Sequence, residues 1–302
     1  MTARTRAEAV LVLTTMIWGS TFAAMKLGLQ EMSPLALTAT RFLLAAIFYL
    51  VFFRRKLFPI SAPSVFRGSI LGLFLFLGFV AQNVGLQYTT ASKSAFITSL
   101  TVVFVPLLQV IIERRSPKLG NIIGVCIVST GLWFLTSPTG SSFNEGDALT
   151  LLCAVFFAVY IVYLDVVSKE MTTLRLTFLQ LASTSIYALI AVVAFEHVVV
   201  SSSAGLLSIL LYLTLFATVL TTFIQTRFQK DTTPTRAGII FTVEPVFACI
   251  IAYALLNEQI GPSGMLGGAL IIVGVITSEL SDAIPFLNTS FDSTEDAPSD
   301  RS

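Results

Sequence analysis

The chain has 302 residues, of which 55% are hydrophobic and only 12% are charged, and its formal net charge is +1. Soluble domains carry about 25% charged residues, so this chain has too little polar surface for a water-soluble globule of its size. The composition, with a mean hydropathy of +0.87, therefore indicates an integral membrane protein. The few charges form short clusters rather than a basic face, so we expect no nucleic-acid partner.

The apolar residues fall into runs of the length that a transmembrane helix needs, which is about 20 residues. Short connections with turn formers, such as Ser33-Pro34 and Thr233-Pro234, separate these runs. The sequence therefore predicts an all-α integral membrane protein with ten transmembrane helices, the first of them a retained helix and not a signal peptide. The predicted spans are 8–27, 34–53, 68–88, 93–113, 119–136, 146–167, 175–195, 204–227, 235–255 and 263–280.

The basic residues collect in alternate connections between the spans, as the positive-inside rule describes for cytoplasmic loops. The intervening connections, such as 28–33, 89–92 and 256–262, contain no lysine or arginine. We therefore expect a multi-pass protein of the cytoplasmic (inner) membrane with both termini in the cytoplasm. The basic connections contain Arg4, Arg6, Arg54, Arg55, Lys56, Arg67, Arg114, Arg115, Lys118, Lys169, Arg175, Arg227, Lys230 and Arg236.

The two halves of the chain resemble each other. Residues 92–106 align with residues 235–249 at an offset of 143, which places Lys93 over Arg236. Two pairs of glycines align at the same offset, Gly124 with Gly267 and Gly131 with Gly274. Since each unit has an odd number of spans, the second copy enters the membrane upside down, as in many secondary transporters.

This repeat divides the chain into two inverted five-helix units, over residues 8–136 and 146–280. Residues 281–302 are acidic and rich in serine, with too few apolar side chains to form a core. We expect this segment to be a disordered acidic cytoplasmic tail.

The paired blocks also resemble a known family. TVEPVFACIIAYALLNEQIGPSGMLGGALIIVGV in the second half, FVPLLQVIIERRSPKLGNIIGVCIVSTGLWF in the first and the opening LTTMIWGSTFAAMKLG are similar to the EamA domain of the drug/metabolite transporter superfamily. The resemblance implies ten spans in two halves and transport of a small molecule. The halves differ, because Pro106 lies four positions later than Pro245 in the alignment and Thr101 lies opposite Glu244. A symmetric site is therefore not expected.

Glu244 and Pro245 lie near the middle of the ninth predicted span. A charged group at the bilayer centre costs roughly 2.5–3.5 kcal/mol, and a proline breaks the helix by leaving a carbonyl near Phe241 without its partner. Both residues are tolerated only where protein or a water-filled cavity surrounds them. Glu244 either lines a central cavity, where it contacts an ammonium group or carries a proton, or it satisfies the groups that Pro245 opens. Pro106 is the corresponding predicted break of the first half.

Aromatic and amide side chains supply further candidates for a cavity lining. Trp18 lies in the first span, and Tyr160 and Tyr163 lie one turn apart on the equivalent sixth span. Gln82 and Asn83 are adjacent amides in the third span. These residues either contact an aromatic or amphipathic substrate or pack between helices. Three isolated amides are expected to join helices by hydrogen bonds, namely Gln109, Gln180 and Gln225.

Three cations are candidates for anchors or gates. Arg41 lies about two turns into the second span, where we expect it to snorkel outward, with a substrate-carboxylate anchor as the alternative. Lys93 and Arg236 begin the equivalent fourth helices of the two halves. They are either interfacial anchors or gate charges.

These features favour a secondary transporter that exports a small metabolite such as an amino acid by alternating access. An importer or exchanger of organic anions or sugar phosphates is the alternative, although it calls for more buried cations than Arg41 alone. A membrane scaffold or sensor is the alternative of another class. An intramembrane enzyme is not expected, because HExxH and GxSxG motifs are missing and His197 is the only histidine.

We expect no cofactor and no metal, since Cys126, Cys153 and Cys249 lie in apolar runs without metal-ligand spacing. The expected partners are a small-molecule substrate and the lipid bilayer, with the protein either a monomer or a homodimer.

Overall fold

The computed structural model describes residues 2–113, 119–136, 144–201, 203–257 and 261–279, together with residues 284 and 287. Within these ranges the chain is helical, and its only extended pairing is an isolated bridge between Met32 and Val200. The elements are α1 (Ala3–Gly28), α2 (Pro34–Leu57), α3 (Ala62–Tyr88), α4 (Ala91–Ser99), α5 (Thr101–Glu113), α6 (Leu119–Thr136), α7 (Glu145–Ser168), α8 (Thr173–Phe195), α9 (Ala204–Thr214), η1 (Leu215–Leu220), α10 (Thr221–Phe228), η2 (Gln229–Asp231), α11 (Pro234–Phe241), α12 (Glu244–Leu256) and α13 (Pro262–Glu279).

Eight segments of the described chain are long and apolar enough to cross a membrane, by length and composition. They coincide with the predicted spans one to four and six to nine, so the multi-pass membrane class is confirmed. The fifth and tenth predicted spans contain shorter apolar stretches, Leu119–Gly131 and Met265–Gly274. The count of ten spans therefore stays a prediction.

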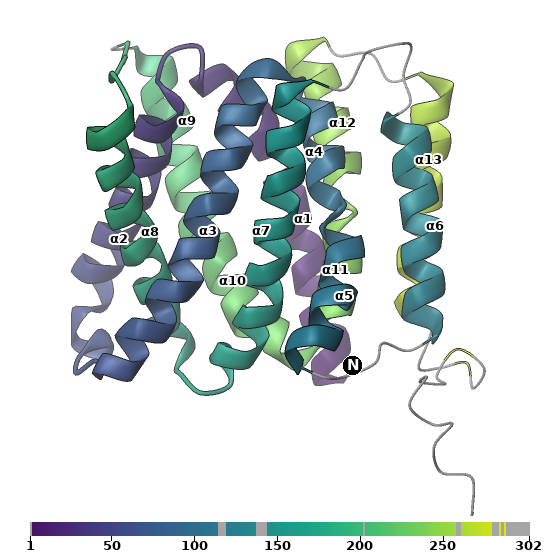
Figure 1. Ribbon diagram of the computed structural model, residues 1–302, viewed down its shortest axis with the longest axis horizontal. Helices are drawn as coiled ribbons and strands as arrows, with labels where there is room; N and C mark the ends of the chain where they lie inside the picture. The colour runs from purple at the N-terminus through teal and green to yellow at the C-terminus, as the bar shows by residue number, and fades with distance from the viewer. Residues whose placement is uncertain are drawn as a thin grey trace, which may run out of the picture.

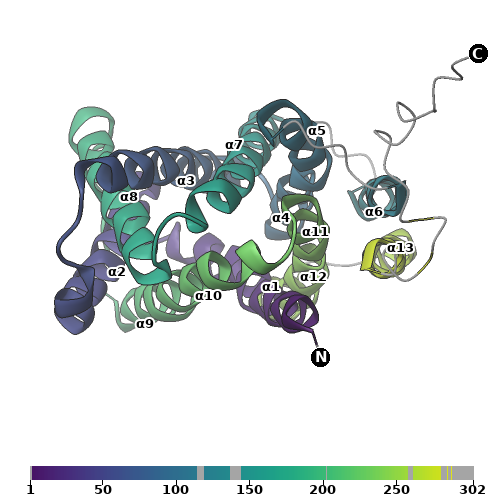
Figure 2. The same cartoon turned by 90° about the horizontal axis from the view of Figure 1, so that it is seen from below.

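The axes of the long helices are roughly aligned with one another, so the helices lie side by side (Figure 1). Seen along these axes, α1 to α5 and α7 to α12 surround a centre, whereas α6 and α13 lie next to each other outside this group (Figure 2). Each of the helices α6 and α13 contributes two glycines to the contact between them. A Cβ atom on Gly131 would lie 2.8 Å from the carbonyl oxygen of Gly267, and one on Gly274 would lie 2.9 Å from that of Gly124. This arrangement favours the predicted inverted repeat, because the four glycines are the two pairs that the repeat aligns.

The fourth helix of each half is interrupted. In the first half the interruption lies at Leu100, between α4 and α5, and α5 continues through Pro106. The expectation of a helix break at Pro106 is therefore wrong. In the second half the interruption lies between α11 and α12, and Pro245 falls in the first turn of α12, where its missing N–H needs no helical partner. This second interruption agrees with the predicted position of the break.

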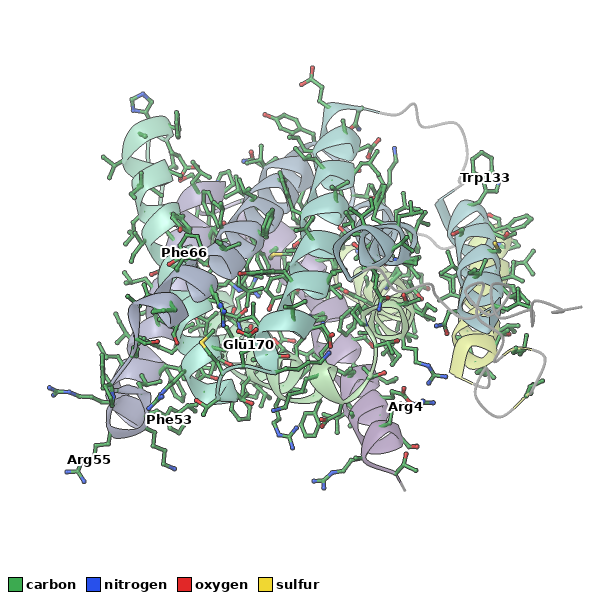
Figure 3. The ribbon with its side chains drawn as sticks, turned by 60° about the horizontal axis from the view of Figure 1, so that its bottom comes forward. Arg4, Phe53, Arg55, Phe66, Trp133 and Glu170 are labelled. Atoms are coloured by element: carbon green, nitrogen blue, oxygen red, sulfur yellow. The ribbon has the colours of Figure 1, made fainter. Side chains whose placement is uncertain are left out.

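The described basic connections gather at one end of the bundle, at the bottom of Figure 1, where the N-terminus lies. Figure 3 shows Arg4, Arg55 and Glu170 at this end, whereas Trp133 lies on α6 at the side of the bundle. Arg67, near the start of α3, forms an ion pair with Glu170. Arg114, Arg115, Lys118 and the predicted acidic tail, except residues 284 and 287, lie outside the described residues.

At the opposite end, the segment after α8 pairs with the connection between α1 and α2. The Ser33 N–H donates to the Val199 carbonyl at 3.0 Å, and the Ser201 N–H donates to the Glu31 carbonyl at 2.8 Å. The Glu196 carboxylate accepts hydrogen bonds from the N–H groups of Leu35 and Ala36, at 2.9 and 2.7 Å, and from the Ser33 hydroxyl. This carboxylate caps the N-terminus of α2, where backbone N–H groups lack helical partners.

Replacing Glu196 with alanine is expected to lower the free energy of unfolding by about 1–2 kcal/mol, because the N-terminus of α2 loses both its hydrogen-bond acceptor and a favourable negative charge. The measurement is thermal unfolding of the purified protein in detergent. Glu31→Ala is the matched control, since no hydrogen bond of the Glu31 side chain is found within the described chain. Equal melting temperatures for the two variants would contradict the capping role.

Candidate functional site

A cavity lies among the helices of both halves, with about 670 Å³ of empty space that includes some open solvent. None of its lining residues within the described chain belongs to α6, α8, α9 or α13. Its apolar and aromatic lining consists of Trp18, Leu75, Phe79, Phe157, Tyr160, Ile161, Gly238 and Phe241. Its polar lining consists of Thr21, Arg41, Gln82, Thr98, Ser99, Thr101, Gln225, Thr242 and Glu244.

Glu244 reaches this cavity because the helix is interrupted immediately before it. The amides at the interruption are already satisfied, since the N–H groups of Thr242 and Val243 donate to the carbonyls of Ile239 and Ile240, both at 3.1 Å. Among the described residues, the Glu244 carboxyl group has neither a hydrogen-bond donor nor an ion-pair partner. This geometry favours the interpretation that Glu244 faces a substrate or carries a proton, and disfavours its role in satisfying groups opened by Pro245.

Close packing of α1 places the Glu244 backbone against Gly19. A Cβ atom on Gly19 would lie 2.6 Å from Phe247 Cβ, 2.7 Å from the Glu244 carbonyl oxygen and 2.9 Å from the Ala248 nitrogen. Only a glycine allows α1 to approach α12 so closely. The neighbouring Trp18 lies edge-on to Phe241 with ring centroids 5.1 Å apart.

Arg41 is buried, with only 2% of its surface exposed, so the expectation that it snorkels outward is wrong. Its Nε donates to Thr218 Oγ1, its Nη2 donates to the Ala217 carbonyl at 2.8 Å, and its Nη1 lies 3.7 Å from Met25 Sδ. The Ala217 carbonyl is accessible to Arg41 because residues 215–220 form a π-helix, which locally interrupts the α-helical pattern. The guanidinium also lies over the Phe79 ring, 4.6 Å from its centroid.

Tyr160 contributes its side chain to the cavity while other residues hold its hydroxyl group. The hydroxyl lies 2.8 Å from Gln180 Oε1 and 3.4 Å from Gln225 Oε1, and Gln180 Nε2 donates to Thr226 Oγ1 at 2.9 Å. These bonds join α7, α8 and α10, so the predicted interhelical role of the two glutamines is confirmed. Tyr163 is half-buried against the hydrophobic core and is not among the residues lining the cavity.

The adjacent amides Gln82 and Asn83 have different surroundings. Gln82 lines the cavity, and its Nε2 lies 3.4 Å from Thr98 Oγ1. Asn83 instead donates from Nδ2 to Thr38 Oγ1 at 2.8 Å and does not line the cavity. The structure therefore brings together Trp18, Gln82, Tyr160, Glu244 and Arg41 at one site, whereas Asn83 and Tyr163 lie elsewhere.

Two ion pairs lie at opposite ends of the bundle. At the end opposite the N-terminus, Lys93 Nζ lies 2.6 Å from Asp147 Oδ2, and this carboxylate is fully buried. At the N-terminal end, Arg236 Nη1 lies 2.9 Å from Glu8 Oε1, with side chains 2% and 9% exposed. Each pair joins the fourth helix of one half to the first helix of the other half. We refer to these two ends as the α4–α7 end and the α1–α11 end.

Inspection of the sequence did not identify Glu8 and Asp147 as candidates. A signal was present, because each acid lies within the first two residues of the first predicted span of its half. The cavity residues Phe79, Phe157 and Phe241 carried no such signal, since most phenylalanines of a membrane protein face lipid or other helices.

Comparison with known proteins gives a consistent result. The EamA-like transporter family matches residues 5–137 and again residues 144–279. A protein of Archaeoglobus fulgidus named as an uncharacterized transporter is 34% identical over 278 residues, which are 92% of this chain and 87% of the relative. YedA of Escherichia coli, named as an uncharacterized inner membrane transporter, is 24% identical over 270 residues, 86% of each chain.

The fold also matches a solved crystal structure, with a TM-score of 0.75 at 17% sequence identity. The match covers 92% of this chain and 97% of that chain. The resemblance to EamA proteins is thus confirmed by the two family matches, which together cover nearly the whole sequence. This multi-pass membrane protein belongs to the EamA-like transporter family.

Proposed function

We propose that this protein is a secondary transporter that exports neutral or aromatic amino acids across the cytoplasmic membrane by alternating access. The observation that carries the proposal is the Glu244 carboxyl group, which faces an aromatic-lined cavity without a partner among the described residues. A carboxyl group in such a place attracts an ammonium group, while Trp18, Phe79 and Phe241 supply apolar contact for a side chain.

The alternative, transport of organic anions or sugar phosphates, has less support from the site. Among the described residues that line the cavity, Arg41 is the only lysine or arginine and Glu244 is the only acid. A phosphate carries nearly two negative charges and is usually held by several cations or N–H groups. In this cavity it would face Glu244 and a single guanidinium.

Alternating access requires that each end of the cavity opens in turn. We propose that the Lys93–Asp147 pair holds the α4–α7 end closed and that the Arg236–Glu8 pair holds the α1–α11 end closed. Each pair spans the two halves, so rocking of one half against the other separates the charges at one end while the other pair stays formed.

The proposed location is the cytoplasmic (inner) membrane, with the basic end of the bundle and both termini in the cytoplasm. The positive-inside rule supports this orientation, and the printed name of YedA places that relative in the inner membrane.

Transport by the purified protein in liposomes tests the proposal. Labelled phenylalanine and leucine are expected to show saturable flux that unlabelled neutral amino acids inhibit, whereas labelled glycerol 3-phosphate is expected to show none. Absence of amino-acid flux from a folded, correctly inserted sample would overturn the substrate assignment.

Glu244→Gln is expected to remove the response of this flux to a pH gradient. A proton and the substrate's ammonium group compete for the Glu244 carboxyl group. In the wild type, an inwardly directed proton gradient is therefore expected to accelerate export. The amide of Glu244→Gln cannot carry that proton. We expect gradient-driven export to fall at least about tenfold. The measurement is export from vesicles with and without the gradient.

Glu31→Gln serves as the matched control, because it makes the same chemical change outside the cavity. A gradient response that persists in Glu244→Gln would show that Glu244 carries no coupling proton.

A further inference from the structure

Two opposite charges line the same cavity without forming an ion pair. Arg41 enters from α2 and Glu244 from the start of α12. Within the described part of the chain, neither side chain has an ion-pair partner within 4.0 Å. Opposite charges in a low-dielectric site attract each other strongly, so their separation requires that the surrounding structure holds them apart.

The surroundings of Arg41 provide that restraint. Its guanidinium is tied to Thr218 and Ala217 on the π-helix and stacks on Phe79. A guanidinium has five N–H donors, and the contacts with Thr218, Ala217 and Met25 each engage one of them. The two remaining N–H groups are the number that a bidentate carboxylate accepts.

The backbone of Glu244 is restrained by helix packing. Its carbonyl oxygen is packed against Gly19, at the close contact of α1 and α12. The side chain belongs to the first turn of α12, and its backbone therefore cannot approach α2 without separating these helices. The cavity is thus lined by a guanidinium held by hydrogen bonds and by a carboxyl group whose backbone is held in place.

We propose that the substrate is a zwitterion whose carboxylate binds Arg41 and whose ammonium group binds Glu244, so that Arg41 determines selectivity for the carboxylate. This inference rests on the proposed transport function. An α-amino acid carries both groups and no net charge, and it therefore supplies an oppositely charged partner to both side chains. An amine or an acid alone leaves one of the two cavity-lining charges without such a partner, which is costly.

Three compounds that share a phenyl ring distinguish the contact with Arg41 from the contact with Glu244. Phenylalanine has both groups, phenethylamine lacks the carboxylate and 3-phenylpropionate lacks the ammonium group. In the wild-type protein, each analogue is expected to inhibit flux of labelled phenylalanine about ten- to hundredfold more weakly than unlabelled phenylalanine does. Equal inhibition by phenylalanine and phenethylamine would overturn the role of Arg41.

Variants then assign the effect to the residue. Arg41→Gln is expected to weaken binding of phenylalanine to the level of phenethylamine while binding of phenethylamine stays unchanged. Thr218→Val, which removes the acceptor of Nε together with the hydroxyl's own hydrogen bond to the Leu213 carbonyl, is expected to produce a smaller loss in the same direction. Arg67→Gln is the control, since it removes an arginine outside the cavity.

The outcomes separate this inference from the proposed function. If amino acids are transported and Arg41→Gln still prefers phenylalanine over phenethylamine, the proposed binding of the carboxylate by Arg41 is overturned. The transporter assignment then stays in place. If Arg41→Gln does not fold, Thr218→Val and the wild-type comparison decide the question. Absence of flux for any amino acid would overturn both proposals.

Discussion

Asp147→Asn is expected to raise the population of conformers open at the α4–α7 end at least about tenfold relative to closed conformers. Glu8→Gln is expected to raise the population of conformers open at the α1–α11 end by a similar factor. Each amide keeps the shape of the acid but loses the charge that attracts Lys93 or Arg236, and hydrogen bonds to charged groups are worth roughly 1.5–3 kcal/mol. A shift of 1.4 kcal/mol changes a population ratio tenfold. Transport is expected to fall in both variants, because one state of the cycle becomes rare.

The measurement is the labelling rate of a single cysteine in the cavity, Ser99→Cys, in a protein whose Cys126, Cys153 and Cys249 are replaced by alanine. A membrane-impermeant thiol reagent is added to one face of oriented vesicles at a time. Asp147→Asn should accelerate labelling from one face, and Glu8→Gln should accelerate it from the other.

Glu145→Gln is the matched control, because Glu145 is an exposed acid in the same first turn of α7 as Asp147. It should leave both labelling rates unchanged. If Asp147→Asn and Glu8→Gln change labelling from the same face, or change only the amount of folded protein, the two ion pairs serve structure and not gating.

Gly19→Ala is expected to lower the free energy of unfolding by about 1–3 kcal/mol and to reduce transport strongly. The added methyl group would lie 2.7 Å from the Glu244 carbonyl oxygen and 2.9 Å from the Ala248 nitrogen, which are backbone atoms that cannot rotate away. Helices α1 and α12 must therefore separate, and this displaces Glu244 from its place in the cavity. Thermal unfolding in detergent and flux in liposomes measure the two effects.

Gly28→Ala makes the same substitution in the same helix and serves as the control. Its nearest neighbours would be methyl groups, of Ile209 at 3.3 Å and of Leu37 at 3.5 and 3.7 Å, and these side chains can adjust. Similar losses of stability and transport in the two variants would show that the close approach at Gly19 has no special role.

Much of the fold could be predicted from the sequence, because the cost of placing polar groups in lipid acts on each segment separately. The second predicted span, 34–53, corresponds to α2 at Pro34–Leu57, and the seventh, 175–195, corresponds to α8 at Thr173–Phe195. The same cost identified Glu244, since a carboxyl group in the middle of a span must face the interior. Only part of the candidate site was accessible in this way.

The rest depended on contacts between residues that are distant in the chain. The surroundings of Arg41 include a carbonyl group on η1, 176 residues away, and position within a span does not reveal such a contact. Proline also proved an imperfect guide to helix breaks, since α5 accommodates Pro106 and the interruption lies at Leu100. A proline removes one backbone donor, but neighbouring helices decide where the backbone opens.

The sequence by itself determined that this is a multi-pass membrane protein, that it is a member of its transporter family and that Glu244 lies in the interior, because hydropathy and local motifs carry that information. The tertiary structure alone decided which charges meet. It paired Lys93 with Asp147 and Arg236 with Glu8, and among the described residues it gave neither Arg41 nor Glu244 an ion-pair partner in the cavity that both line. Ion pairs act over a few ångströms, so only the packing of the two halves determines which side chains come within that range.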